Sequence, residues 1–222
     1  MQKQSRAKGS LNWIFIFAAA VAGLTLSACA PQKFLGAFSP QYGPQETCGF
    51  VQNVYGERIS WKGNLPIKFA IHESIPTEFH PAITEAMHTW ELAVGRKLFE
   101  VVSWADRGLL APRQDGTNVI YLMNTWENNK TQEQGRTSVY WVGDQIRETD
   151  IRINGKDFNF YMDQPASGRD VYFSSLIVHE LGHALGLKHE DHSESVMGTY
   201  LASATERSAI SGFDIDSVRC EY

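Results

Sequence analysis

The spacing of three histidines near the end of the chain constrains its local fold more than any other feature. The run begins His179-Glu-Leu-Gly-His183 and continues Ala-Leu-Gly186-Leu-Lys-His189. Residues four apart lie on one face of a helix, so His179 and His183 are predicted to project side by side. His189 can join them only if the chain turns, and Gly186 can adopt the positive φ that ends a helix. The sequence therefore predicts a helix that ends near Gly186 and three converging imidazole rings.

Three converging histidines are typical of a catalytic zinc site. Zinc binds imidazole nitrogen, and a catalytic site has three protein ligands with a fourth position open. A purely structural zinc would need a fourth protein ligand, and we interpret the nearby His192 as a surface residue. Glu180 follows the first histidine and can take a proton from zinc-bound water, which then attacks a peptide carbonyl. We therefore predict one Zn²⁺ held by His179, His183 and His189, with Glu180 as the general base.

A methionine eight residues beyond the third histidine makes the pattern more specific. The short form H-E-x-x-H can arise by chance, but the eleven-residue form with its glycine and third histidine is far stricter. Ser195-Val-Met197-Gly lies where a tight turn, the Met-turn, follows such a motif. We predict that Met197 forms this turn.

The first 28 residues are predicted to be a signal peptide rather than part of the fold. Three basic residues precede an apolar stretch from Leu11 to Leu26, which is short for a membrane span. The Ser-Ala-Cys29 that follows resembles the lipobox of bacterial lipoproteins, in which the cysteine is lipidated after cleavage. This resemblance implies an exported chain that Cys29 anchors to the outer membrane, facing the periplasm or the cell surface. An uncleaved anchor helix is the alternative.

The rest of the chain divides into a tether and a domain. Residues 29–47 are rich in Pro, Gly and Gln and are predicted to be a flexible tether. Residues 48–222 are long enough for one domain of ordinary size. The formal net charge of −5 gives no indication of a nucleic-acid partner.

Two cysteines, Cys48 and Cys220, remain once Cys29 is set aside. A pair of cysteines in an exported protein is typical of a disulfide, which here would join the start of the domain to its end. The alternative is that the Cys48 thiolate binds the zinc and blocks the site, as an inhibitory cysteine in a propeptide does. The residues around Cys48 lack the arginine and the Pro-Asp pair that accompany such an inhibitory cysteine, so we favour the disulfide.

Hydrophobic periodicity predicts an α+β order of elements. Apolar residues at positions 83, 87, 90 and 94 place one stripe along a helix, and a second helix is predicted at about 172–185. Short β-rich runs lie at residues 65–71, 99–102, 118–122, 136–142 and 149–153. The order is strand, helix, several strands and helix, which is not a repeating βαβ pattern.

The chain resembles the metzincin clan of zinc metalloproteases, and within that clan the matrixins, especially the bacterial ones. The resemblance rests on the motif at 179–189 with Met197, and it extends to residues 149–154 and to Phe213-Asp-Ile-Asp-Ser-Val218. It implies a twisted, mostly parallel five-stranded sheet with one antiparallel edge strand, three helices and a cleft over the zinc.

The same resemblance implies how this domain would bind its substrate. An extended protein or peptide segment would add to the edge strand near residues 137–142 through backbone hydrogen bonds. Met197 would form an apolar floor under the histidines without binding the metal. The calcium loops of the animal enzymes are not visible, and binding of Ca²⁺ through Asp and Asn residues is left open.

Two positions depart from the matrixin pattern. Glu190 follows the third histidine, as in astacins. Astacins and serralysins have a tyrosine two residues after the methionine, whereas here Thr199 takes that position and Tyr200 comes next. We hypothesise that Tyr200 assists turnover.

The alternative to an endopeptidase is a catalytically silent lipoprotein that binds peptides or a partner protein. Glu180 argues against it, because binding alone needs no general base.

Overall fold

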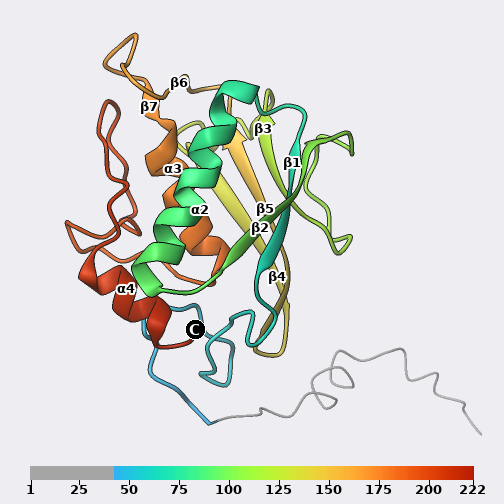
Figure 1. The fold of residues 1–222 in the computed structure, drawn as a ribbon, viewed down its shortest axis with the longest axis vertical. Helices are drawn as coiled ribbons and strands as arrows, with labels where there is room; N and C mark the ends of the chain where they lie inside the picture. The colour runs from blue at the N-terminus through green and yellow to red at the C-terminus, as the bar shows by residue number, and fades with distance from the viewer. Residues whose placement is uncertain (1–42) are drawn as a thin grey trace, which may run out of the picture. The chain divides into compact units, whose positions relative to one another are not determined.

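The computed structural model describes residues 43–222, and the predicted signal peptide and Cys29 lie outside the described residues. Within residues 43–222, no helix is both long and apolar enough to cross a membrane. Figure 1 shows the arrangement of the elements. In chain order they are β1 (Ile67–His72), the 3₁₀ turn η1 (Thr77–Phe79), α2 (His80–Val94), β2 (Phe99–Asp106), β3 (Asn118–Met123), β4 (Gly135–Val142), β5 (Gln145–Asn154), β6 (Phe160–Tyr161), β7 (Val171–Tyr172), α3 (Phe173–Ala184) and α4 (Gly212–Arg219).

The five longer strands form one mixed sheet in the order β2-β1-β3-β5-β4. Strands β1, β2, β3 and β5 run parallel, whereas β4 pairs antiparallel with β5. The outer edge of β4 pairs with no other strand in the described part of the chain. Helices α2 and α3 lie side by side against one face of the sheet (Figure 1). The predicted fold, a mostly parallel five-stranded sheet with one antiparallel edge strand and three helices, is confirmed.

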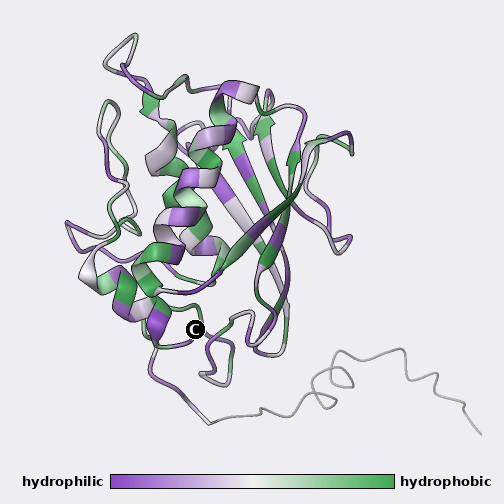
Figure 2. Ribbon diagram, viewed as in Figure 1, coloured by the Kyte–Doolittle hydropathy of each residue, from purple (hydrophilic) through white to green (hydrophobic). Residues whose placement is uncertain are grey.

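The main core lies between this sheet and the two long helices. Helix α2 buries Ile83, Met87 and Trp90, which belong to the predicted apolar stripe. The Trp90 indole Nε1 donates a hydrogen bond of 2.9 Å to the Val178 carbonyl of α3, so the largest fully buried side chain also joins the two helices. Figure 2 shows α2 alternating between hydrophilic and hydrophobic residues, as expected of a helix with one buried face. Gly95, at φ 71°, ends this helix.

Strand β5 is longer than its sequence suggested. The prediction covered residues 149–153, but β5 begins at Gln145, and its first half continues the antiparallel pairing with β4 that extends to Ile153. This half contains Glu148, a carboxylate that is buried because the backbone N–H groups of Asp115 and Gly116 donate hydrogen bonds to it. Strand β2 likewise extends beyond the prediction to Asp106, and the two-residue strands β6 and β7 were not predicted.

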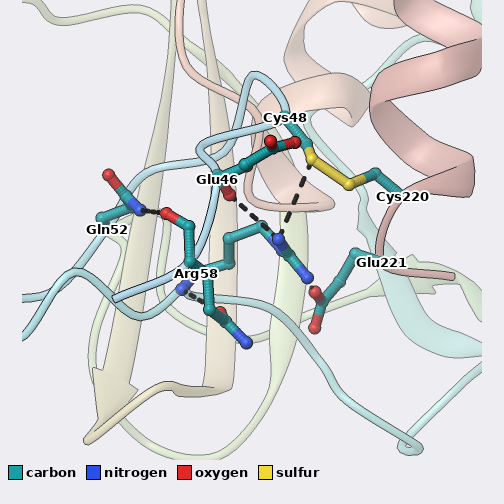
Figure 3. The surroundings of a disulfide bond; sticks show 7 residues. Glu46, Cys48, Gln52, Arg58, Cys220 and Glu221 are labelled. Carbon is teal, nitrogen blue, oxygen red and sulfur yellow. Dashed lines mark hydrogen bonds and ion pairs between the residues drawn. A yellow bond between two sulfur atoms is a disulfide. The ribbon is translucent and has the colours of Figure 1, made fainter. Parts of the chain in front are cut away.

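The two ends of the described domain are joined covalently, because Cys48 and Cys220 form a disulfide (Figure 3). Beside it, Arg58 Nε donates a hydrogen bond of 2.6 Å to the Glu221 carboxylate, and Ser60 donates another of 2.6 Å. Burial works to raise the pKa of the Glu221 carboxyl, but the hydrogen bonds from Ser60 and Arg58 outweigh it and hold that pKa below its ordinary value. The disulfide is therefore reinforced by a network of charge-assisted hydrogen bonds.

Candidate active site

The active-site helix α3 ends in a turn that brings the third histidine to the first two. The Gly186 N–H donates to the His183 carbonyl at 2.9 Å, and the Leu187 N–H donates to the Gly182 carbonyl at 3.1 Å. This pair of bonds is the Schellman ending of a helix, which requires a left-handed residue. Gly186 provides it at φ 104°, and a Cβ there would lie 2.4 Å from the Ile59 carbonyl oxygen. Both the conformation and the close approach therefore require glycine at the predicted turn.

The three histidines converge through their Nε2 atoms. The Nε2 of His183 lies 3.1 Å from the Nε2 of His179 and 3.1 Å from that of His189. Three nitrogens bound tetrahedrally at zinc distances would be separated by about 3.3 Å. Among residues 43–222, this is the one group of three or more His, Cys, Asp or Glu side chains close enough to hold a metal ion. The arrangement of donor atoms therefore fits a zinc ion with an open fourth position.

Hydrogen bonds to backbone carbonyls orient two of the rings. His179 Nδ1 lies 2.7 Å from the Val196 carbonyl oxygen, and His183 Nδ1 lies 2.8 Å from that of Leu187. A carbonyl can only accept, so each Nδ1 carries the proton and each Nε2 keeps its lone pair for a metal. Burial lowers the pKa of His179 to about 3 and that of His183 to about 4, so both rings are neutral near pH 7.

Glu180 is buried beside the histidines and held from the edge strand. Thr137 Oγ1 on β4 donates to Glu180 Oε2 at 2.6 Å. Burial raises the pKa of the Glu180 carboxyl to about 7, against the opposing effect of the Thr137 hydrogen bond. Gly135 makes room on the other side, since a Cβ there would lie 2.6 Å from Glu180 Oε1. Sequence reasoning missed Gly135 and Thr137, because Thr137 and Glu180 are 43 positions apart and no local pattern links them.

Met197 lies beneath α3, and its turn is fixed by α4. The side chain is buried, and a Cβ on Gly182 of α3 would lie 2.2 Å from Met197 Sδ. The Asp214 carboxylate of α4 accepts hydrogen bonds from Ser195 Oγ at 2.5 Å and from the Val196 N–H at 3.1 Å. The Met197 N–H donates to Ser195 Oγ at 2.9 Å. The methionine thus packs against the turn of α3 that lies between the first two histidines.

A cleft of about 570 Å³ opens over the three histidines. One wall is the edge strand β4, which contributes Gly135, Thr137, Val139 and Trp141. The opposite wall comes from residues 186–189 and 198–201. Because the outer edge of β4 is free along this wall, its backbone groups are available to an extended peptide.

Of the remaining residues considered for the site, Tyr200 lines the cleft, whereas His192 and Cys48 do not. The Tyr200 side chain is 76% exposed. His192 is exposed, and its ring stacks on Phe213 with 3.9 Å between the centroids, away from the three ligands. The Cys48 sulfur is bonded to Cys220 and is therefore not a ligand at the histidines. Residues 43–222 contain no second group of three such side-chain ligands, and Ca²⁺ binding, which the sequence left open, stays open.

The fold and the site together define a metalloprotease, with a buried glutamate beside three converging histidines under a free edge strand. A profile of the matrixin family matches residues 60–222, which is most of the chain and includes the whole of the site. The chain therefore belongs to the matrixin family, and the resemblance seen in the sequence is confirmed. No curated protein matched the chain.

Proposed function

We propose that this matrixin is a zinc-dependent endopeptidase that a lipid at Cys29 anchors to a bacterial membrane. The observation that carries the catalytic part is the meeting of three Nε2 atoms with a buried glutamate in one cleft. His179, His183 and His189 hold the zinc ion. A zinc ion there supplies Lewis-acid activation of water and of a peptide carbonyl.

The chain's own residues then move the proton. Glu180 accepts a proton from the attacking water and passes it to the departing amine. Its carboxylate is oriented by the 2.6 Å hydrogen bond from Thr137, and its burial keeps bulk water from competing. The free edge of β4 binds the substrate in an extended conformation, which places a peptide bond over the histidines.

The membrane anchor is supported by the N-terminal sequence alone. Basic residues, an apolar stretch and Leu26-Ser-Ala-Cys29 follow one another in the order of a lipoprotein signal. The lipid on Cys29 would leave the domain in the periplasm or at the cell surface. Growth with a radioactive fatty acid tests this: the wild-type chain becomes labelled and Cys29→Ser does not. Equal labelling of both chains, or labelling of neither, contradicts the anchor.

The catalytic proposal is tested on residues 30–222, which begin directly after Cys29 and are loaded with zinc. Bound metal is measured, and cleavage of a peptide library is compared for wild type, Glu180→Gln and chelator-treated protein. We expect one zinc per chain in wild type and in Glu180→Gln, with cleavage by wild type only. Equal cleavage in all three samples would refute the proposed peptidase activity. Zinc binding without any cleavage would favour the alternative, a catalytically silent protein that binds peptides.

A further inference from the structure

The last turn of helix α3 obtains its hydrogen-bond donors from distant parts of the chain. The final carbonyls of a helix have no partner within it and must be satisfied from outside. The Ala184 carbonyl accepts from the Trp61 indole Nε1 at 2.8 Å, and the Leu185 carbonyl accepts from the Tyr222 hydroxyl at 2.6 Å. The two donors are joined as well, because the Trp61 N–H donates to the Tyr222 hydroxyl oxygen at 3.0 Å. Burial raises the pKa of the Tyr222 phenol, so this hydroxyl keeps the proton that it donates.

The chain that leaves α3 is paired with the beginning of the domain. The Val51 N–H donates to the Gly186 carbonyl at 3.0 Å, and the Lys188 N–H donates to the Gly49 carbonyl at 2.8 Å. Between these two bonds the segments form an antiparallel bridge. The turn after α3 is therefore one half of a short two-stranded pair and not a free loop.

This pairing acts on two of the three histidines. The Leu187 carbonyl accepts from His183 Nδ1 at 2.8 Å and so orients that ring. The Nδ1 of His189 forms no hydrogen bond within residues 43–222, so this ring is placed by the backbone that carries it. The backbone just before His189 is held by the same pairing, and that just after it by a bond of 2.9 Å from the Glu190 N–H to the Met197 carbonyl. The position of the third histidine thus depends on the beginning of the domain.

The disulfide joins the two sources of these contacts (Figure 3). Cys48 directly precedes Gly49, and Cys220 lies two residues before Tyr222. The rings of Phe50 and Tyr222 also meet edge to face, with 5.8 Å between their centroids. The covalent bond therefore keeps the paired segment and the Tyr222 hydroxyl together at the end of α3.

We propose that the Cys48–Cys220 disulfide and the Tyr222 hydroxyl are positioning groups for the zinc site. They hold the backbone of residues 184–189, and so fix the third ligand and the carbonyl that orients the second. This inference rests on the proposed function, because it concerns the same zinc ion. Neither group touches the metal or the substrate; both keep the three Nε2 atoms together before the ion arrives. A group that only stabilised the fold would leave zinc affinity unchanged, because a variant that is still almost entirely folded presents the same site.

Zinc affinity tests the inference. The full chain, purified in detergent and freed of metal, is titrated with zinc in competition with a chelator of known affinity. We expect the dissociation constant to rise about 10–100-fold in Tyr222→Phe and in the double variant Cys48→Ser/Cys220→Ser, as is typical when a group that orients a metal ligand is lost. The controls Tyr121→Phe and Gly95→Ala should bind zinc as wild type does. Tyr121 is 5% exposed in a separate apolar cluster, and Gly95 ends α2.

Hydrogen exchange of the metal-free chain gives a readout that depends on neither zinc nor cleavage. The amides of Val51 and Lys188, which form the pairing, should lose protection in Tyr222→Phe and in the double variant but not in the two controls.

Tyr222→Phe keeps the disulfide, so its result decides even if the double variant does not fold. Wild-type zinc affinity in folded Tyr222→Phe, or an equal loss of affinity in Tyr121→Phe, overturns the inference while leaving the proposed function intact. A wild-type chain that binds no zinc overturns the proposed zinc site, and this inference with it.

Discussion

Replacing Gly186 by alanine should destabilise the domain far more than the same change at Gly95. Both glycines have positive φ, 104° and 71°, and both end a helix. A Cβ at Gly95 meets nothing within 4 Å. A Cβ at Gly186 would lie 2.4 Å from the Ile59 carbonyl oxygen and 3.1 Å from the Phe50 ring. Both variants therefore carry backbone strain, which is greater at φ 104°, and only Gly186→Ala adds a collision.

The magnitudes follow from these contacts. An alanine in the left-handed region costs about 1–2 kcal/mol, which is the whole effect expected for Gly95→Ala. Gly186→Ala adds a backbone collision that can be relieved only if the chain moves by about 1 Å. Such overpacking costs about 1–3 kcal/mol more. The total of about 2–5 kcal/mol is a large part of the about 5–15 kcal/mol that holds a typical domain folded.

Guanidinium unfolding at saturating zinc measures the difference. Both variants should keep the wild-type dependence of the unfolding free energy on denaturant concentration, while their midpoints fall by unequal amounts. His189 lies three residues beyond Gly186, so Gly186→Ala should also weaken zinc binding, whereas Gly95→Ala should not. Equal losses of stability in the two variants would refute the reasoning, because the contact with Ile59 would then cost nothing.

Three further predictions concern the general base, the charge network and the disulfide. Gly135→Ala should lower kcat up to about 100-fold without loss of zinc, because its Cβ displaces the Glu180 carboxylate by about 0.8 Å. Glu221→Gln should reduce stability by about 1.5–3 kcal/mol at pH 7. Because the folded-state pKa of Glu221 is lowered, its contribution is present above the unfolded pKa near 4.5 and disappears as the pH falls through the folded value. Replacing Cys48 and Cys220 by serine should lower the free energy of unfolding by up to about 5 kcal/mol. The disulfide closes a loop of 172 positions and so reduces the entropy of the unfolded chain.

Each of these has a control or a decisive result. Gly168→Ala, where a Cβ meets nothing within 4 Å, should leave kcat unchanged, and equal kinetics for Gly135→Ala would contradict the fixed placement of Glu180. For Glu221→Gln, unfolding curves from pH 7 to pH 3 should converge with wild type, and a gap that stays constant is the opposing result. Equal thermal midpoints of the serine variant and the oxidised wild type would show that the disulfide adds no stability.

The convergence of the three histidines could be predicted because its geometry is local. The motif from His179 to His189 carries its helix, its turn and its ligands within eleven residues, and each of these follows from spacing alone. The strands and the two long helices followed from apolar periodicity in the same way, whereas the arrangement of the sheet was implied by the resemblance to the matrixins. A pattern of this kind reflects interactions between residues that are close together in the sequence.

Other parts depend on contacts between distant segments. Glu148 looks like a loop residue in the sequence, yet it is buried in β5 because backbone N–H groups 32 and 33 residues away satisfy it. Thr137 and Gly135 look like ordinary strand residues until β4 is placed beside α3. Tyr222 donates to the Leu185 carbonyl at 2.6 Å and so satisfies the end of the active-site helix from the other end of the chain. No periodicity signals such pairings.

The disulfide has a topological consequence. Cys48 and Cys220 close almost the whole described domain into one covalent ring. A single cut in any loop within the ring opens it but releases no fragment, so a nicked molecule keeps its full mass until it is reduced. This matters for a protein that we propose to cut other chains, since its own neighbouring copies are within reach. Cuts before Cys48 are different, because they free the domain whole from everything that precedes it.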